Sequence, residues 1–188
     1  MSREAPARLF YREGITMQLQ TLDLGNIFTY AGKRWILLDR REEFHLCIAA
    51  DNEGPCAYDG GLRARFDEAA ISGRLNGAYF ADLLQNGGTV TDFNSLLMNL
   101  SISMTVGDCI RSPHVGLLSW HQRLRYDTLI PRVWRWEWTC TISDGIYGSG
   151  LRCVAGKPQD YAYFPPNHPD PVLRPAISLR GWAEVGKE

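Results

Sequence analysis

"LDLGNIFTYAGKRWILLDRREEFHLCIAADN", residues 22–52, is the stretch from which we predict the fold. Short apolar runs alternate with turn-forming residues, which is typical of strands in a hairpin or meander. We expect a two-residue turn at Gly32-Lys33. The continuous apolar run 35–38 indicates a strand that is covered on both faces. The stretch therefore predicts three successive strands, over residues 27–31, 34–40 and 44–50.

Two later segments have the spacing of amphipathic helices. In "ISGRLNGAYFADLLQNGG" (71–88), apolar residues recur at helical intervals, with Ser72 as N-cap and Gly87-Gly88 as stop signal. A second helix is expected near residues 119–128, with Ser119 as its N-cap. The segment "TDFNSLLMNLSISM" (91–104) indicates another short helix that runs into a strand.

The remaining segments complete an α+β pattern. Residues 51–61 and 163–171 are rich in Gly, Pro, Asp and Asn, so we expect loops there. Strands are expected near both ends of the chain, with two or three helices between them, which favours pairing of the terminal strands. We predict a single α+β domain over residues 17–188, preceded by an N-terminal arm over residues 1–16.

Composition excludes some classes of partner. The chain of 188 residues is 45% hydrophobic and 22% charged, which is ordinary for a globular domain. Its 20 basic and 21 acidic residues give a net charge of −1, so no basic excess favours direct binding of nucleic acid. No apolar run has the length of a membrane span or the character of a signal peptide. We therefore expect a cytoplasmic protein, or one packaged into a particle that is made in the cytoplasm.

The cysteines and histidines form no recognisable site in the sequence. Five cysteines are scattered without any C-x-x-C pair, so we expect free thiols in a reducing compartment and no metal or cofactor. The four histidines lie far apart, and the sequence contains no nucleophile, phosphate-binding or zinc-protease motif. A catalytic role is therefore the less favoured interpretation.

The segment "WRWEWTCTISDG" (134–145) raises the question of a binding platform. In a strand, its three alternating tryptophans would share one face. We expect Trp134 and Trp138 in the core, because each would bury about 150–250 Å² of aromatic surface. Trp136 would be the exception if the strand bulges, and a sugar-stacking platform is the open alternative.

The order of these segments resembles a family of bacterial and phage domains of unknown function, common in prophages of Gram-positive gut bacteria. The motifs that carry the resemblance, in their order along the chain, are "LGNIFTYAGKRWILLD" (24–39), "ISGRLNGAYFADLL" (71–84), "VGLLSWHQRLRYDTLIP" (115–131), "WRWEWTCTISDG" (134–145) and "VLRPAISL" (172–179). This chain departs from the family pattern at Thr139-Cys140-Thr141, and its Pro-rich loop before the last strand is longer than that of the family. The late segments also resemble C-type-lectin-like and formylglycine-generating-enzyme-like folds, which implies a mixed α+β domain of that kind.

The resemblance implies a non-catalytic, phage-encoded module that binds another macromolecule, most plausibly a host or phage protein, through loops on a rigid scaffold. The loops 51–66 and 155–171 are the expected surface. The candidate binding residues are Tyr58, Tyr161, Tyr163, Phe164 and His168. The expected core residues are Trp35, Leu75, Phe80, Trp134, Trp138 and Pro175. An inhibitor of a host defence complex, of the anti-CRISPR type, is one alternative, and location in the host cytoplasm or on the virion follows from the partner.

Two further alternatives involve chemistry. A formylglycine-generating type of enzyme would use the cysteines Cys140 and Cys153 on adjacent strands. A lectin-type calcium site would use the loop "PPNHPD" (165–170), but it has a histidine where an oxygen ligand is expected, and calcium needs about six or more oxygens. Neither pattern is complete in the sequence.

Overall fold

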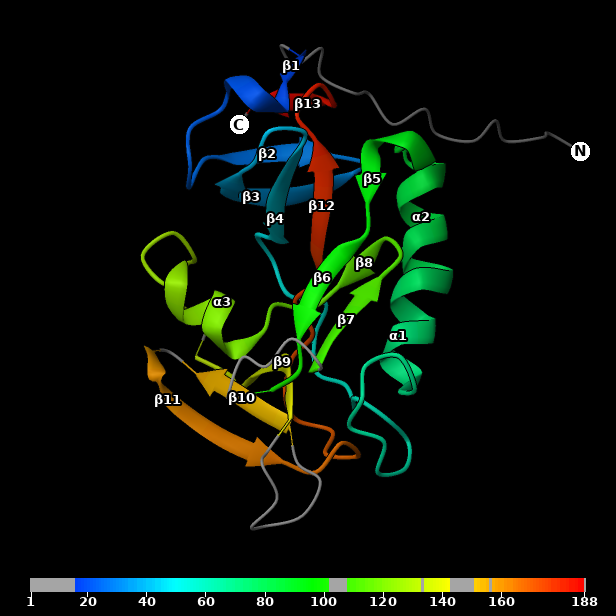
Figure 1. The fold of residues 1–188 in the computed structure, drawn as a ribbon, viewed down its shortest axis with the longest axis vertical. Helices are drawn as coiled ribbons and strands as arrows, with labels where there is room; N and C mark the ends of the chain where they lie inside the picture. The colour runs from blue at the N-terminus through cyan, green and yellow to red at the C-terminus, as the bar shows by residue number, and fades with distance from the viewer. Residues whose placement is uncertain (1–15, 102–107, 133, 143–150, 156, 188) are drawn as a thin grey trace, which may run out of the picture.

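The structure is a computed structural model that describes residues 16–101, 108–132, 134–142, 151–155 and 157–187. It confirms the α+β class: most of the regular secondary structure is antiparallel sheet, with a helical run on one side and a short helix on the other (Figure 1). The strands of the main sheet are β1 (Thr16–Gln18), β2 (Ile27–Tyr30), β3 (Lys33–Arg40), β4 (Phe44–Ala49), β5 (Phe93–Asn94), β8 (Val115–Gly116), β12 (Ala176–Arg180) and β13 (Glu184–Lys187).

The order of strands in this sheet is β1-β13-β2-β3-β4-β12-β5, and β8 also pairs with β12. The predicted pairing of the terminal strands is confirmed, because β1 pairs with β13 and β13 continues onto β2. Strand β12 pairs with β4 along one edge and with β5 and β8 along the other, so it joins the meander to the middle of the chain. A short 3-10 turn, η1 (Leu19–Thr21), links β1 to the body.

There are two smaller sheets among the described residues: a three-stranded sheet at the bottom of Figure 1, and a two-stranded ribbon beside β8. The three-stranded sheet has the order β11-β10-β9, from the strands β9 (Glu137–Ile142), β10 (Leu151–Ala155) and β11 (Lys157–Phe164). The two-stranded ribbon consists of β6 (Leu96–Asn99) and β7 (Cys109–Ser112). Helix α3 (Trp120–Arg125) follows β8 and begins at Ser119 with the predicted cap, here a full capping box with Gln122.

The predicted helix over 71–88 is one helical run with a π-turn in its middle: α1 (Ala70–Arg74), η2 (Leu75–Tyr79) and α2 (Phe80–Gln85). The π-turn holds Asn76, whose side-chain amide donates to the carbonyl of Val115 at 3.0 Å and to Ser112 Oγ at 3.0 Å. Its Oδ1 accepts from the backbone amides of His114 at 3.2 Å and Val115 at 3.0 Å. Asn76 thereby binds the turn between β7 and β8 to the helix.

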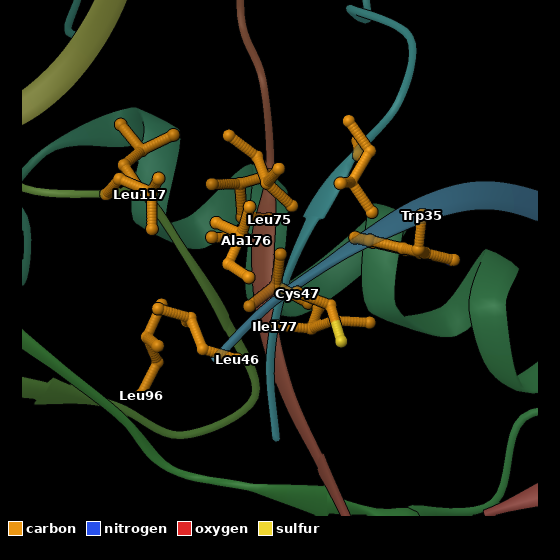
Figure 2. Close-up of a cluster of buried hydrophobic side chains, with 14 of the residues drawn as sticks. Trp35, Leu46, Cys47, Leu75, Leu96, Leu117, Ala176 and Ile177 are labelled. Atoms are coloured by element: carbon orange, nitrogen blue, oxygen red, sulfur yellow. The ribbon is translucent and has the colours of Figure 1, made fainter. Parts of the chain in front are cut away.

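The core gathers around β12. Figure 2 shows Ala176 and Ile177 between side chains of the meander and those of the helix. All four residues of the apolar run 35–38 are fully buried, as predicted for a strand covered on both faces. Of the expected core residues, Trp134 is 99% exposed and is a wrong prediction. The predictions that are confirmed as buried are Trp35, Leu75, Phe80, Trp138 and Pro175.

Trp134 is exposed because β9 begins only at Glu137. Side chains alternate between the two faces of the sheet from Trp136 onward, so Trp136 and Trp138 share the face that points to the core. Trp138 is buried there, and Trp136 is partly buried and packs against the core. Trp134 lies in the preceding bend, where none of the described residues covers its indole. The exception to core packing is therefore Trp134 and not Trp136.

Other local predictions need correction. The segment 91–104 has no α-helix where it is described: a 3-10 turn, η3 (Val90–Asp92), leads directly into β5 and β6. The β2–β3 turn is formed by Ala31 and Gly32, both at positive φ, one position before the predicted pair. Of the predicted N-terminal arm, only Thr16 lies within the described residues, and it belongs to β1.

Ser72 does not cap the first helix, because helix α1 begins at Ala70. Asp59 caps it from a distance: its carboxylate accepts from the backbone amides of Ala70 at 2.9 Å and of Gly61 at 2.8 Å. These hydrogen bonds to the charged form lower the pKa of the Asp59 carboxyl below its ordinary value of 3.8. Asp59, eleven residues before the start of the helix, thus accepts the capping hydrogen bond that is expected of Ser72.

We expect the substitution Asn76→Ala to lower the free energy of unfolding by about 2–4 kcal/mol, because several buried backbone groups of the β7–β8 turn lose their partner. Chemical denaturation measures this. The control is Asn52→Ala, since Asn52 is exposed and its side chain accepts one backbone bond, from Gly54 at 3.2 Å. An equal effect of the two substitutions would contradict the role assigned to Asn76.

Asp59 makes the free energy of unfolding depend on pH in the acid range. Because its pKa is lower in the folded than in the unfolded chain, its contribution is present well above pH 3.8 and is lost as the pH falls through the folded-state pKa. We expect Asp59→Asn to weaken stability at pH 7 and to flatten its decline between about pH 5 and pH 2. Denaturant titrations across that range test this, with Asp170→Asn, an exposed aspartate, as control. An unchanged pH profile would show that Asp59 is not the cap.

Candidate binding surface

The sheet β9–β11 has two faces with different surroundings. Trp138 and Cys140 of β9 point to the inner face, where Trp138 packs against Tyr58 with ring centroids 5.5 Å apart. Thr141, on the other face, accepts a hydrogen bond at its Oγ1 from the backbone amide of Trp120, the first residue of α3, at 2.9 Å. Helix α3 contacts all three strands of this sheet. The helix therefore lies against the outer face.

An aromatic surface covers the outer face beside α3. Tyr161 and Tyr163 are two residues apart in β11 and so share this face, with 47% and 36% of their surface exposed. Their ring centroids lie 6.0 Å apart, and Trp120 of α3 contacts Tyr161 at 5.9 Å. All these contacts are edge-to-face. We call Trp120, Tyr161 and Tyr163 the outer aromatic surface.

The five predicted binding residues do not form one site. Phe164 points to the inner face, where its ring packs against Trp136 at 5.5 Å. His168 contacts Phe164 at 4.7 Å and is partly buried. Only Tyr161 and Tyr163 come together on an exposed face. The alternation along β11 explains the split, because the segment predicted as part of a loop over 155–171 is a strand over 157–164.

Tyr58 is a wrong prediction as an exposed binding residue: it is fully buried, and its ring also packs against Phe66 with centroids 6.5 Å apart. Burial raises the pKa of its hydroxyl well above the ordinary value. Its backbone amide donates to Pro166 O at 2.8 Å, and a bridge joins Pro55 to Val172. The loops 51–66 and 155–171, predicted as a recognition surface, thus satisfy each other's backbone groups over part of their length.

A buried charge network holds α3 in place behind the outer aromatic surface. Glu137 of β9 lies between two arginines: its Oε1 is 3.5 Å from Arg123 Nε on α3, and its Oε2 is 3.5 Å from Arg174 Nη1. Arg123 also pairs with Asp127 at 3.4 Å. All three central residues are at most 3% exposed. Burial is the main effect on the Arg174 guanidinium and lowers its pKa, whereas the Glu137 carboxylate opposes that shift.

Arg174 also binds backbone. Its Nε and Nη2 donate to the carbonyls of Ala49 and Ala50 at 2.7 and 2.8 Å, and its Nη1 donates to Pro131 O at 3.2 Å. Arg174 therefore ties the end of β4 and the segment after α3 to the start of β12. The "RPA" of the closing motif is structural here, since Arg174, Pro175 and Ala176 are all buried.

Trp120 is the member of the surface that sequence reasoning missed. It follows the N-cap Ser119, and the first turn of a helix carries no apolar periodicity that would mark a residue as exposed or buried. One sequence pattern does point to this surface. Tyr161 and Tyr163 alternate with Ala162 in "YAYF" (161–164), which indicates a strand with both tyrosines on one face, and a neighbouring element must border that face.

The cysteines predicted for a formylglycine-generating chemistry, Cys140 and Cys153, lie buried on the adjacent strands β9 and β10, and neither forms a disulfide. Burial raises the pKa of both thiols and keeps them protonated. A protonated, buried thiol is a poor nucleophile and a poor metal ligand.

In comparisons with known proteins, no protein-family model, no curated protein and no solved structure matches this chain. No helix among the described residues is both long and apolar enough to cross a membrane.

We expect Glu137→Gln to lower the free energy of unfolding by about 3–5 kcal/mol, because it leaves the buried guanidinium of Arg174 without a paired carboxylate and leaves Arg123 with Asp127 alone. Chemical denaturation at neutral pH provides the measurement, and Glu184→Gln, on an exposed position of β13, serves as the control. A loss no larger than that of the control would mean that the network does not hold α3 on the sheet.

Proposed function

We propose that the protein is a non-catalytic binding module that engages a partner protein through the outer aromatic surface. The observation that carries the proposal is the pair of exposed tyrosines, Tyr161 and Tyr163, bordered by Trp120. Tyrosine and tryptophan dominate the energetics of protein interfaces, because they bury a large rigid area and keep a polar group for hydrogen bonding. The buried network around Glu137 supplies a rigid support, which limits the entropy lost on binding.

The proposed mode is recognition by side chains. Strand β11 is the outer strand of its sheet, so a partner strand could in principle pair with its free edge. This mode is disfavoured, because Pro158 has no N–H to donate and because the pairing of β11 with β10 shifts register between Val154 and Ala155. A sugar platform is also disfavoured: the rings stand at 67° and 77° to their neighbours and do not offer one flat face. The surface of a partner protein can be complementary in shape to projecting ring edges and hydroxyl groups of this kind.

The proposal includes a phage or prophage origin, a C-type-lectin-like relationship of the fold, and a place of action in the host cytoplasm or on the virion. Support for these comes from the order of the sequence motifs, and for the fold also from the paired terminal strands β1 and β13. The partner is then a host or a phage protein complex. A host defence complex as partner would make the protein an inhibitor of the anti-CRISPR type.

The test replaces Tyr161 with a photoreactive p-benzoylphenylalanine and irradiates the protein in lysates of Gram-positive gut bacteria, with and without an induced prophage. We expect one protein to cross-link from position 161 and not from position 182, where Trp182 is similarly exposed at 49%. Mass spectrometry of the product separates a host complex from a virion component.

The matched variants measure the contribution of the surface to affinity. We expect the double substitution Tyr161→Ser with Tyr163→Ser to weaken binding to that partner by about 10- to 100-fold, as hot-spot residues do. Trp182→Ser should leave the affinity unchanged. Equal cross-linking from both positions, or full affinity of the double variant, would overturn the proposal.

A further inference from the structure

A cleft of mixed polar and apolar lining opens on the side of α3 that faces the β6–β7 ribbon. It consists of two hollows of about 490 and 350 Å³, which share Arg41, Leu97 and Gln122. These residues come from the turn after β3, from the ribbon and from α3 respectively. Volumes of this size are typical of sites for small molecules. None of the three residues of the outer aromatic surface lines either hollow, but Trp120 contacts His121 of the smaller hollow with ring centroids 5.1 Å apart.

The ribbon presents one face to this cleft. In the antiparallel register, Leu97 pairs with Arg111 and Asn99 pairs with Cys109, and all four line the hollows. The alternate residue Met98 is fully buried in the core. Leu97 is 44% exposed, a large apolar side chain that borders the smaller hollow together with the ring of Tyr126.

The charge of the smaller hollow is positive. Arg41 and Arg125 line it, and no aspartate or glutamate is among the described residues of its lining. The carboxylate of Asp39 is in contact with the lining, where it accepts a hydrogen bond from the Tyr126 hydroxyl at 2.9 Å. Arg125 has no ion pair within the part of the chain that the structure describes, and its guanidinium lies 5.6 Å from the centroid of the Tyr126 ring. Arg41 uses its Nε toward Asp39 at 3.4 Å. The carboxylates of Glu42 and Glu43 border only the larger hollow.

We propose that the smaller hollow binds a small organic phosphate, with its phosphate group between Arg41 and Arg125 and its apolar body against Leu97 and Tyr126. Guanidinium groups bind phosphate through two parallel hydrogen bonds, and two of them compensate its charge of nearly two. The amide groups of Asn99 and Gln122 lie in the same lining and offer further donors. This site does not depend on the proposed function of the outer aromatic surface.

The test titrates the full chain with phenyl phosphate and follows the backbone and arginine Nε–H signals by NMR. Inorganic phosphate and phenol are the separate arms for the anion and the ring. We expect phenyl phosphate to shift the signals of Leu97, Gln122 and Arg125, phosphate to bind more weakly at the same residues, and phenol to bind more weakly still. Arg125→Gln should lower the affinity for phenyl phosphate by about tenfold or more, the loss expected for a charge-assisted pair.

The control is Arg132→Gln, which removes the same charge from an exposed position outside the lining of the cleft. Arg41→Gln provides a second variant, so that a fold defect in one does not decide the outcome. Equal binding of phenol and phenyl phosphate would overturn the proposal, as would an equal loss in Arg132→Gln. Absence of shifts in the cleft at millimolar phenyl phosphate would do the same.

Discussion

The structure depends on the placement of one buried carboxylate. Glu137 neutralises Arg123 and Arg174, and through them it connects α3, β9, the end of β4 and the start of β12. These elements come from widely separated parts of the chain, and they form the junction between the main sheet and the three-stranded sheet. Without the carboxylate, the buried guanidinium of Arg174 would lose its paired charge and Arg123 would keep only Asp127, which costs several kcal/mol. Both proposed sites border α3, so both inherit their geometry from this junction.

Much of the fold could be predicted because its signals are local. The meander over β2 to β4, the stop of the helix at Gly87 and the capping box at Ser119 follow from residues within a few positions of each other. The errors arise where a distant partner decides. Asp59 caps a helix eleven residues downstream, and Asn76 binds a turn that lies 36 to 39 residues further along the chain. A single sequence contains no signal for such pairings.

The candidate site could be predicted only in part, for a related reason. Tyr161 and Tyr163 are exposed as expected, but Tyr58 is buried because its loop pairs with the Pro-rich segment, whose composition predicts a second recognition loop. Gly, Pro and Asp mark irregular backbone, and irregular backbone is exposed only when nothing satisfies its polar groups. The cleft was not foreseen at all, because Arg41, Leu97 and Arg125 meet through tertiary packing of three elements.

The pairing of the terminal strands has a consequence for how the body can be carried. Thr16 lies opposite Gly186 at one end of the molecule, and the outer aromatic surface lies near the other end (Figure 1). The first and last strands of the described chain, β1 and β13, therefore lie side by side. A domain fused beside Thr16 or Lys187 would therefore be attached at a distance from the outer aromatic surface and would not pass over it.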